Sequence, residues 1–404
     1  MNEELCAEAP RELIGTSLTA PAHPANLLRA VSAQPRELLH VFPNFNVGGA
    51  QVRFAALVAG LRGSYNHTIL ALNGNYDAAA LLPTGASVRL GADFVRPRGT
   101  AATIKTLEAE LARRRPDLLL TYNWGSIEMA LANLLHRRPH MHMEDGFGPE
   151  EANRQLGRRV WTRRLALGRA HLVVPSITLK DIATRIWGLD PRRIHHIANG
   201  VAQKGQPQCS LRDLGLNLPE GRPLIGWAGA LRPEKNPSRL LRAFAPLKDQ
   251  ACLLIIGAGP EHDKVVCEAA ALGLRESLIL LGPRTDARDI LMQCDLAALS
   301  SDTEQMPMIV LEAMDAGLPI VSCDVGDVKR MVASENRPFV TARKDAAMTA
   351  ALSTLLSDAR LRSTVGKANQ RRVRTTYSHP RMVEAHGALI ARLSAHATWV
   401  RANG

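Results

Sequence analysis

Two glutamates in the second half of the sequence are spaced for chemistry on a phosphorylated sugar. Glu304 lies in a loop after a predicted strand, and Glu312 follows eight positions later, about one turn inside a helix predicted to begin near Met308. Because of this spacing, the two carboxylates cannot act as a close pair on one helix face. We expect Glu304 to meet a sugar and Glu312 to accept hydrogen bonds from ribose hydroxyls. The amides of Met308 and Ile309 are predicted to meet phosphate. The alternative is that both glutamates are ordinary surface and helix residues.

A second candidate site follows another predicted strand, in the loop from Gly229 to Pro237. Arg232 and Lys235 stand three positions apart in this loop. Two cations at that spacing can clamp a diphosphate, the arginine through its fork and the lysine as a point charge. Loop cations are in general simply solvated, so it is the strand, loop and helix context that favours the phosphate interpretation.

Gly48 and Gly49 form a third candidate, at the turn between the first predicted strand and a helical pattern that runs through Leu61. Paired glycines let a backbone approach an anion, and the new helix directs its unpaired N–H groups at that anion. A plain tight turn needs only one glycine, which favours a ligand-binding role. Gly257 to Pro260 also follow a strand, but His262 stands at the third glycine position of a dinucleotide fingerprint. There a tight turn is the preferred interpretation.

Short apolar runs that alternate with longer amphipathic stretches predict the elements that hold these loops. In the first half the predicted strands are Leu38 to Phe42, Thr68 to Leu72, Leu118 to Tyr122, Met141 to Glu144, Leu172 to Pro175 and His195 to Ile197. In the second half they are Leu224 to Trp227, Cys252 to Ile256, Leu278 to Leu281, Leu296 to Leu299, Ile320 to Cys323 and Phe339 to Thr341. Alternation of this kind indicates parallel sheets with helices on both faces.

The predicted fold class is therefore α/β, with two Rossmann-like doubly wound domains facing a central cleft. Residues 1–35 are expected to form a loose N-terminal extension, and residues 36–201 and 223–376 the two domains. The glycine- and proline-rich stretch 202–222 is the predicted linker. Residues 377–404 are predicted to form a closing helix and a tail.

Length and composition limit the possible classes of protein. At 404 residues the chain exceeds the roughly 250 to 300 residues that one hydrophobic core serves, so two domains are expected. Hydrophobic residues at 46% and charged residues at 22% argue against disorder, a fibre or a coiled coil. Six cysteines without a CxxC pair indicate reduced, mostly buried thiols. No apolar run is long enough to span a bilayer and no signal-peptide pattern begins the sequence, which predicts a cytoplasmic protein.

The net charge of +12 is concentrated in residues 151–200, which hold ten Lys or Arg against three acids. Such a patch suits a polyanion, or peripheral contact with the anionic inner face of the plasma membrane at about 1 kcal/mol for each placed cation. A GC-rich genome also produces arginine-rich proteins and is an equally good explanation. Nucleic acid is disfavoured, because only 4% of residues are aromatic and no binding motif interleaves them with the basic run.

Six stretches of the sequence together carry a resemblance to a known family. They are Gly48-Gly49, Asn199-Gly200-Val201, Leu231 to Lys235, Gly257 to Pro260, the element from Glu304 to Glu312, and Val321 to Gly326. From about His40 to its end, the sequence resembles the family 4 retaining glycosyltransferases of the GT-B type, which have two Rossmann-like domains. The Glu304 element in its full context is the most specific of the six.

The resemblance implies a role for several residues. Glu304 would lie at the donor sugar, and Glu312 would bind the ribose of the nucleotide. Arg232 and Lys235 would hold the diphosphate, with Lys235 and Glu304 in the catalytic set. The first domain would bind the acceptor and the second the nucleotide sugar.

Three departures from the family pattern bear on the site. Ala230 stands where the family has arginine in a Gly-Arg-Leu turn, so Arg232 would supply that charge. Gln305 replaces the glycine that is common after the first glutamate, which would alter the sugar pocket. Where the family carries His-Gly-Phe at a strand end, Asp145 occupies the place of the histidine, with His142 nearby as a rival.

Asp145 in that place would change the chemistry of the site. A carboxylate near the anomeric carbon could stabilise an oxocarbenium-like transition state or accept a proton from the acceptor. A structural role, in which Asp145 caps the glycine-containing loop that follows it, fits the sequence equally well. Asn123, His142 and Glu144 lie at strand ends on the same rim and are candidates for the acceptor side.

The sequence therefore predicts a glycosyltransferase that moves a hexose from a nucleoside diphosphate sugar to a growing, lipid-linked polysaccharide or glycolipid with retention of configuration. Such an enzyme would serve polysaccharide and cell-envelope biosynthesis. No Asp-x-Asp element follows a strand, so neither a metal nor a resident cofactor is expected, and cations and helix amides would neutralise the leaving group. Two alternatives keep the same fold: a sugar-nucleotide epimerase and a non-catalytic nucleotide-sugar-binding protein.

Overall fold

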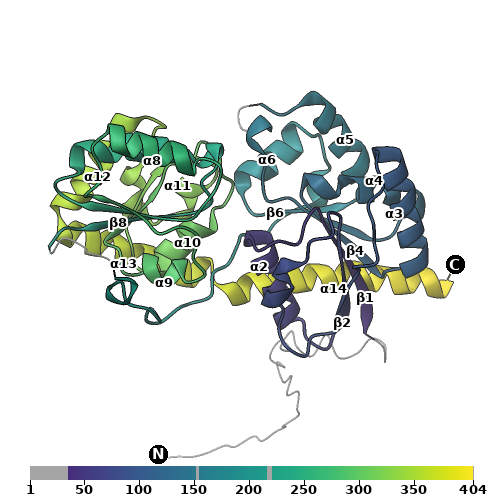
Figure 1. The fold of residues 1–404 in the computed structure, drawn as a ribbon. Helices are drawn as coiled ribbons and strands as arrows, with labels where there is room; N and C mark the ends of the chain where they lie inside the picture. The colour runs from purple at the N-terminus through teal and green to yellow at the C-terminus, as the bar shows by residue number, and fades with distance from the viewer. Residues whose placement is uncertain (1–34, 152–153, 216–220, 404) are drawn as a thin grey trace, which may run out of the picture. The chain divides into compact units, whose positions relative to one another are not determined.

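A computed structural model describes residues 35–151, 154–215 and 221–403 of the chain. Residues 1–34, where most of a loose extension is predicted, lie outside the described residues, as does Cys6. Figure 1 shows two sheets, each with helices on both faces. All strand pairings in both sheets are parallel, which confirms the predicted α/β class with two Rossmann-like units.

The first sheet has seven strands in the order β3-β2-β1-β4-β5-β6-β7. Its strands are β1 (Arg36–Phe42), β2 (Tyr65–Ala71), β3 (Val88–Leu90), β4 (Leu118–Tyr122), β5 (His140–Met143), β6 (His171–Val174) and β7 (Ile194–His196). The helices between them are α2 (Gly49–Gly60), α3 (Thr100–Arg114), α4 (Ile127–His136), α5 (Gly157–Leu167) and α6 (Ile177–Arg185). The prediction missed β3, because this three-residue strand is largely exposed and has no apolar run.

The second sheet has six strands in the order β10-β9-β8-β11-β12-β13. Its strands are β8 (Leu224–Ala228), β9 (Cys252–Ile256), β10 (Leu278–Leu280), β11 (Leu296–Leu299), β12 (Ile320–Cys323) and β13 (Val340–Thr341). The helices are α7 (Pro237–Phe244), α8 (His262–Ala271), α9 (Ala287–Leu291), α10 (Met308–Asp315), α11 (Val328–Met331), α12 (Asp345–Ser357) and α13 (Ala359–Thr376). All six predicted strands are present, with ends shifted by at most two residues.

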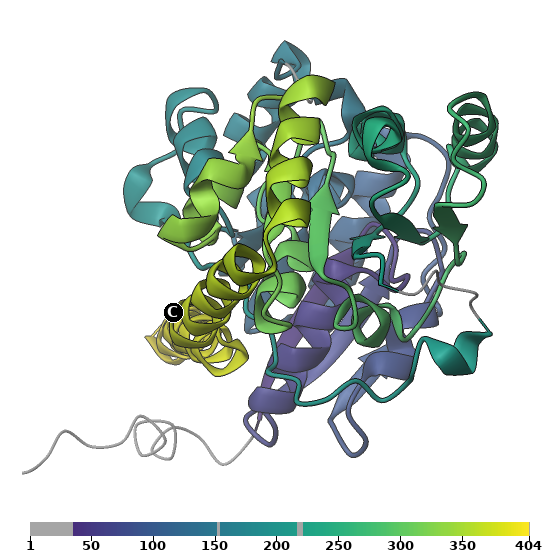
Figure 2. The ribbon, with the colours of Figure 1, turned by 90° about the vertical axis from the view of Figure 1, so that its left-hand side faces the viewer.

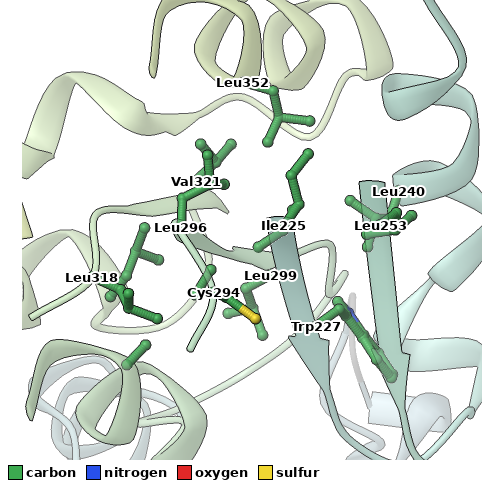
Figure 3. Close-up of a cluster of buried hydrophobic side chains, with 14 of the residues drawn as sticks. Ile225, Trp227, Leu240, Leu253, Cys294, Leu296, Leu299, Leu318, Val321 and Leu352 are labelled. Atoms are coloured by element: carbon green, nitrogen blue, oxygen red, sulfur yellow. The ribbon is translucent and has the colours of Figure 1, made fainter. Parts of the chain in front are cut away.

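The core of the second sheet explains why its strands are continuous apolar runs. Ile225 and Leu253 on neighbouring strands are fully buried, because helices cover both faces of the sheet (Figure 3). Trp227, two residues further along the strand of Ile225, is 1% exposed (Figure 3). Three of the five described cysteines, Cys252, Cys294 and Cys323, are buried, as predicted, and all five are reduced thiols.

The last helix, α14 (His379–Asn403), returns from the second half of the chain to the first sheet (Figures 1 and 2). Val201 forms a parallel bridge with Ser378 just before this helix begins. The amide of His379 donates to the Val201 carbonyl at 3.0 Å. The helix then packs on α2, where a side chain on Gly60 would collide with Val383. This helix occupies most of residues 377–404, the segment predicted to hold a closing helix and a tail.

The strand orders fix where a ligand can bind. In each sheet the chain reverses its direction of winding between two central strands, β1 and β4 in the first sheet and β8 and β11 in the second. Loops at the carboxyl ends of such strands diverge and leave room for a ligand. No helix in the described part of the chain is long and apolar enough to cross a bilayer.

Candidate active site

A cavity of about 220 Å³ lies between loops that follow β4, β5, β8 and β11. It is lined by Asn123, Asp145, Gly146, Phe147, Arg232, Glu234, Lys235, Thr303, Glu304 and Gln305. The three predicted catalytic residues, Glu304, Lys235 and Asp145, are therefore brought together by both halves of the chain. Asn123, the acceptor-side candidate, and Arg232, the diphosphate candidate, line the same cavity.

Lys235 and Glu304 form an ion pair in this cavity, with Nζ of the lysine 2.5 Å from Oε1 of the glutamate. The hydroxyl of Ser301 donates to the same glutamate oxygen at 2.7 Å. Ser300 holds the lysine backbone by donating from its hydroxyl to the Lys235 carbonyl at 2.8 Å. The side chains are 27% and 11% exposed, so a ligand can reach both charges.

The side chain of Arg232 makes few contacts with the rest of the protein. It is 62% exposed, and its Nη1 lies 3.9 Å from Oε1 of Glu234. An exposed pair at this separation contributes little to stability. The guanidinium can therefore turn towards an anion in the cavity at little cost, as a diphosphate clamp requires.

Gly257 and Gly259 shape the loop that carries Arg232 and make no dinucleotide cradle. A side chain on Gly257 would collide with the carbonyl of Gly229, and one on Gly259 with the carbonyl of Leu231. Leu231 also donates from its amide to the Ala258 carbonyl at 2.9 Å. These glycines thus let two loops lie backbone to backbone, in agreement with the tight-turn interpretation.

Asp145 is clamped by Arg53, a buried residue of α2. Nη1 of Arg53 donates to Oδ1 of Asp145 at 2.5 Å, and Nη2 donates to Oδ2 at 2.8 Å. The Asp145 amide donates to Oδ1 of Asn123 at 2.7 Å, which ties the loops after β4 and β5 together. Among the described hydrogen bonds, no amide of the loop after Asp145 donates to its carboxylate, so the predicted cap is not formed. The side chain is 24% exposed and faces the cavity.

Arg53 and Asn199 are functional candidates that the sequence reasoning missed. Besides holding Asp145, Arg53 donates from Nη1 to Oδ1 of Asn199 at 3.0 Å. The side-chain Nδ2 of Asn199 in turn donates to the Met306 carbonyl at 3.1 Å, just before α10. The sequence did place Asn199 in a family motif, but Arg53 looks like any arginine on an amphipathic helix. Only its position one turn after Gly49 is a signal.

Gln305 and Asp327 of the second half contact the start of α6 in the first half. The hydroxyl of Ser176 donates to Oε1 of Gln305 at 3.0 Å, and both residues are buried. The Asp327 carboxylate accepts hydrogen bonds from the Ile177 amide at 2.7 Å and from the Thr178 amide at 3.1 Å. A carboxylate at a helix N-terminus is favoured by the unpaired amides and the helix dipole. The glutamine that departs from the family glycine therefore forms one wall of the cavity and joins the two halves.

Glu312 stands one turn inside α10 and is half-buried. Burial raises the pKa of its carboxyl above the usual range, an effect partly offset by the positive charges of Arg288 and Lys204. No described side chain forms a hydrogen bond or ion pair with this carboxylate. Its oxygens therefore remain available as acceptors for hydroxyl groups, which is what the predicted ribose contact needs.

The glycine turn and the start of α10 lie next to each other. Helix α2 begins at Gly49, with Gly48 as its extended N-cap, and α10 begins at Met308. A Cβ on Gly49 would lie 3.7 Å from Cγ of Met308. Gly48, Gly49, Met308 and Ile309 do not line the 220 Å³ cavity, so their predicted donor contacts stay predictions.

His142 and Glu144, two of the acceptor-side candidates, are buried away from the cavity. The side chains are 0% exposed, with Nε2 of His142 at 3.6 Å from Oε2 of Glu144. Nδ1 of His142 lies 2.7 Å from the Thr121 hydroxyl. Strand β5 ends at Met143, and Glu144 directly after it is buried on the same side as His142, two residues earlier. Direct contact of either side chain with an acceptor is thereby excluded in this conformation, and His142 is no rival to Asp145.

One of the ten cations in the basic stretch 151–200, Arg163, is not part of an exposed patch. Arg163 is buried and donates to the Glu151 carboxylate at 2.9 and 3.0 Å. Its guanidinium lies 4.8 Å from the ring centre of Trp124 and 4.6 Å from that of Trp187. Cation–π packing of this kind is structural.

Two family models match adjoining parts of the chain. The model described as Glycosyltransferase Family 4 matches residues 47–203, and the model described as Glycosyl transferases group 1 matches residues 215–372. The chain belongs to the family 4 glycosyltransferases of the GT-B type. Asn123 and Asp145 fall in the first matched region of this glycosyltransferase, and Lys235 and Glu304 in the second.

Two curated relatives have different named activities. The D-inositol 3-phosphate glycosyltransferase of Rhodococcus opacus is 27% identical over 275 residues, which cover 63% of this glycosyltransferase and 60% of the relative. The alpha-maltose-1-phosphate synthase of Mycolicibacterium smegmatis is 25% identical over 351 residues, which cover 79% of this chain and 86% of the relative. The match to the D-inositol 3-phosphate glycosyltransferase of Rhodococcus jostii spans 47% of that relative. The chain thus spans about half to three fifths of the Rhodococcus relatives.

A solved structure shares the GT-B fold. The Anabaena protein HepE, in complex with UDP and glucose, superposes with a TM-score of 0.76 at 20% sequence identity. The alignment covers 88% of this glycosyltransferase and all of the HepE chain. At this identity the likeness concerns the fold.

Proposed function

We propose that this chain transfers a hexose from a nucleoside diphosphate sugar to a hydroxyl of a lipid-linked glycan, with retention of configuration. The observation that carries the proposal is the Lys235–Glu304 ion pair in a cavity that Asp145 and Arg232 also line. Cations beside carboxylates suit a substrate with an anionic diphosphate at one end and a polyhydroxylated sugar at the other.

The roles follow from where charge develops. As the bond between the anomeric carbon and the diphosphate oxygen breaks, negative charge grows on the leaving group, where Lys235 and Arg232 neutralise it. The acceptor oxygen bonds to the anomeric carbon on the same face, and its proton passes to the departing phosphate oxygen. Both oxygens of Asp145 already accept hydrogen bonds from Arg53, so we assign it electrostatic stabilisation of the oxocarbenium-like sugar.

Glu304 and Glu312 position the donor in this proposal. Glu304 accepts hydrogen bonds from sugar hydroxyls while Lys235 and Ser301 fix its carboxylate. Glu312 accepts from the ribose hydroxyls. HepE has been solved with UDP and with UDP-glucose, so UDP is the first base to test.

The donor assignment is tested by a thermal-shift panel with UDP, GDP, ADP, dTDP, their sugar conjugates and NAD, each with magnesium and with EDTA. A ligand that binds only the folded state raises the melting temperature. We expect a rise with one nucleoside diphosphate, equal in magnesium and in EDTA. A rise with NAD alone, or with no ligand of the panel, would contradict the donor site. Once an acceptor is found, the anomeric proton coupling in the NMR spectrum of the product decides retention.

Replacing Glu312 with glutamine should raise the melting temperature above neutral pH while it weakens donor binding. A carboxyl whose pKa is raised on folding holds its proton more tightly in the folded state, so its contribution to stability falls as pH rises past its unfolded pKa. Glu312→Gln is therefore expected to melt above wild type at about pH 8 and to match it near pH 4. Nucleotide affinity should fall roughly tenfold to a hundredfold, because hydrogen bonds to a charged acceptor are lost.

The matched control for this prediction is Glu276→Gln, which removes an exposed carboxylate in the same half of the chain. It should change neither the pH dependence of melting nor the affinity for nucleotide, both measured by thermal shift. If Glu312→Gln binds nucleotide as tightly as wild type, the ribose assignment is wrong.

The lipid-linked acceptor part of the proposal is supported by α5. Trp161 and Leu165 lie one turn apart on this helix and are 69% and 63% exposed, and Arg158 is exposed one turn earlier. Aromatic and aliphatic side chains beside cations suit an anionic membrane surface. We expect the protein to sediment with vesicles that contain phosphatidylglycerol and not with pure phosphatidylcholine vesicles. Trp161→Ser with Leu165→Ser should abolish sedimentation, and unchanged sedimentation of this variant would rule α5 out as the contact.

A further inference from the structure

A second cavity of about 550 Å³, called the groove from here on, lies at the edge of the first sheet opposite the active site. Its walls are the carboxyl-terminal ends of α4 and α5, the starts of β5 and β6, and the last described side chains of α14. Strand β5 runs from this groove, at His140, to the loop that places Asp145 in the catalytic cavity. The groove and the cavity share no lining residue. The groove is therefore a separate feature, and none of the predicted transferase chemistry uses it.

The floor of the groove is apolar. Ala130, Ala166 and Ala170 contribute small side chains, and Leu134 and Leu393 contribute larger ones. Small residues on the facing helices α4 and α5 leave a space where larger residues would have packed together. A ligand that fills this space must present a hydrocarbon surface.

The rim of the groove is basic. Five arginines line it, namely Arg137, Arg138, Arg169, Arg193 and Arg392, and no aspartate or glutamate does so. Within the described chain, no ion pair joins Arg137, Arg169 or Arg392 to an acid. Arg193 donates from Nη1 to the Arg169 carbonyl at 2.9 Å, which brings the two arginines together. The guanidinium groups of Arg137, Arg169 and Arg392 on one rim fit an anion with several acceptor oxygens, such as a phosphate.

Two histidines of the groove add no charge of their own near neutral pH. Burial, together with the charges of His195, Arg193 and Arg392, lowers the pKa of His171 to about 4. Burial also lowers the pKa of His140 to about 3, helped by His142 and His171. Burial is thus the main reason that both histidines are neutral, and the positive charge of the groove comes from its arginines.

We propose that this groove binds one anionic amphiphile, a phosphate group on a hydrocarbon body, with the phosphate at the arginines and the hydrocarbon on the alanine and leucine floor. The site goes beyond the proposed transferase reaction, because it is separate from the donor cavity. We propose an amphiphile because the groove has both an apolar floor and a basic rim. An apolar floor alone would bind a neutral ligand, and a basic rim alone would bind free phosphate.

The proposal is tested by isothermal titration of the full chain with dodecyl phosphate below its micelle concentration. We expect saturable binding with one site per chain. Inorganic phosphate, which is the head alone, and dodecyl maltoside, which has the same tail without the charge, should each bind at least about tenfold more weakly. Arg169→Gln with Arg392→Gln should weaken dodecyl phosphate binding by about tenfold or more, since two charge-assisted contacts are lost.

Two further variants make the test specific. Arg98→Gln removes an exposed arginine of the first half outside the groove and should bind dodecyl phosphate as wild type does. Leu134→Trp fills the floor of the groove and should weaken binding of dodecyl phosphate without changing that of inorganic phosphate. The nucleotide-induced thermal shift should be the same in all variants, so failure of this site and failure of the donor site are distinguishable.

Several outcomes would overturn the proposal. Equal affinity of wild type and the Arg169/Arg392 double variant would do so, as would an equal loss in Arg98→Gln. Several bound amphiphiles per chain would indicate adsorption of a surfactant to the surface. Inorganic phosphate that binds as tightly as dodecyl phosphate would show a simple anion site with no role for the apolar floor.

Discussion

Replacing Lys235 with alanine is expected to lower kcat/KM for donor turnover by about a hundredfold to a thousandfold, the effect of removing one group that stabilises developing charge. Nζ of Lys235 lies 2.5 Å from Oε1 of Glu304 in the cavity. Alanine removes the cation from the leaving group and leaves the glutamate with Ser301 as its remaining partner. The diphosphate then loses neutralisation and meets an uncompensated carboxylate.

Release of nucleoside diphosphate, with and without acceptor, measures this effect. Lys264→Ala is the matched control, because this lysine is 61% exposed and pairs with Glu261 on the surface of the same half. It should turn over donor at the wild-type rate. Lys235→Arg keeps the charge and should recover part of the lost rate. A Lys235→Ala enzyme with wild-type kcat/KM would remove the lysine from the mechanism.

Replacing Arg53 with methionine is expected to lower the free energy of unfolding by about 3 kcal/mol or more, the usual effect of removing one member of a buried ion pair. The guanidinium of Arg53 is buried and donates to both oxygens of Asp145 and to Asn199. Methionine keeps much of the apolar volume but leaves these acceptors without their donor. Urea unfolding measures the loss.

The double variant Arg53→Met with Asp145→Asn decides what Asp145 does. Removing both charges should recover much of the lost stability, because no uncompensated charge remains. If Asp145 stabilises the sugar in the transition state, donor turnover stays low in this stable variant, by about a hundredfold. Recovery of turnover together with stability would make Asp145 a structural partner of Arg53 only.

Much of the fold could be predicted, because its strands are buried on both faces. Runs such as Cys252 to Ile256 are apolar at every position, and such a run between helical patterns has few other interpretations. Strand β3 was missed for the opposite reason, since its residues are largely exposed and its pairing with β2 is what makes it a strand.

The catalytic candidates could be predicted where the residues of a motif lie close together in the sequence. Glu304, Lys235 and Asp145 each lie in the segment that follows a strand, so their place near a carboxyl edge is set by the chain itself. His142 and Glu144 failed as acceptor candidates because sequence position near a strand end does not say which face a side chain takes. Burial of both was decided by packing against α5 and the rest of the first sheet.

By itself, the sequence determined the two parallel sheets, the loops that carry chemistry and the family. Only the tertiary structure decided that Arg53 clamps Asp145, that Gln305 and Asp327 contact the start of α6, and that arginines from distant parts of the sequence line one apolar groove. The physical reason is that the residues in these contacts lie far apart along the chain. Local patterns report backbone preference and burial, whereas an ion pair or a groove depends on which distant segments the sheet order places side by side.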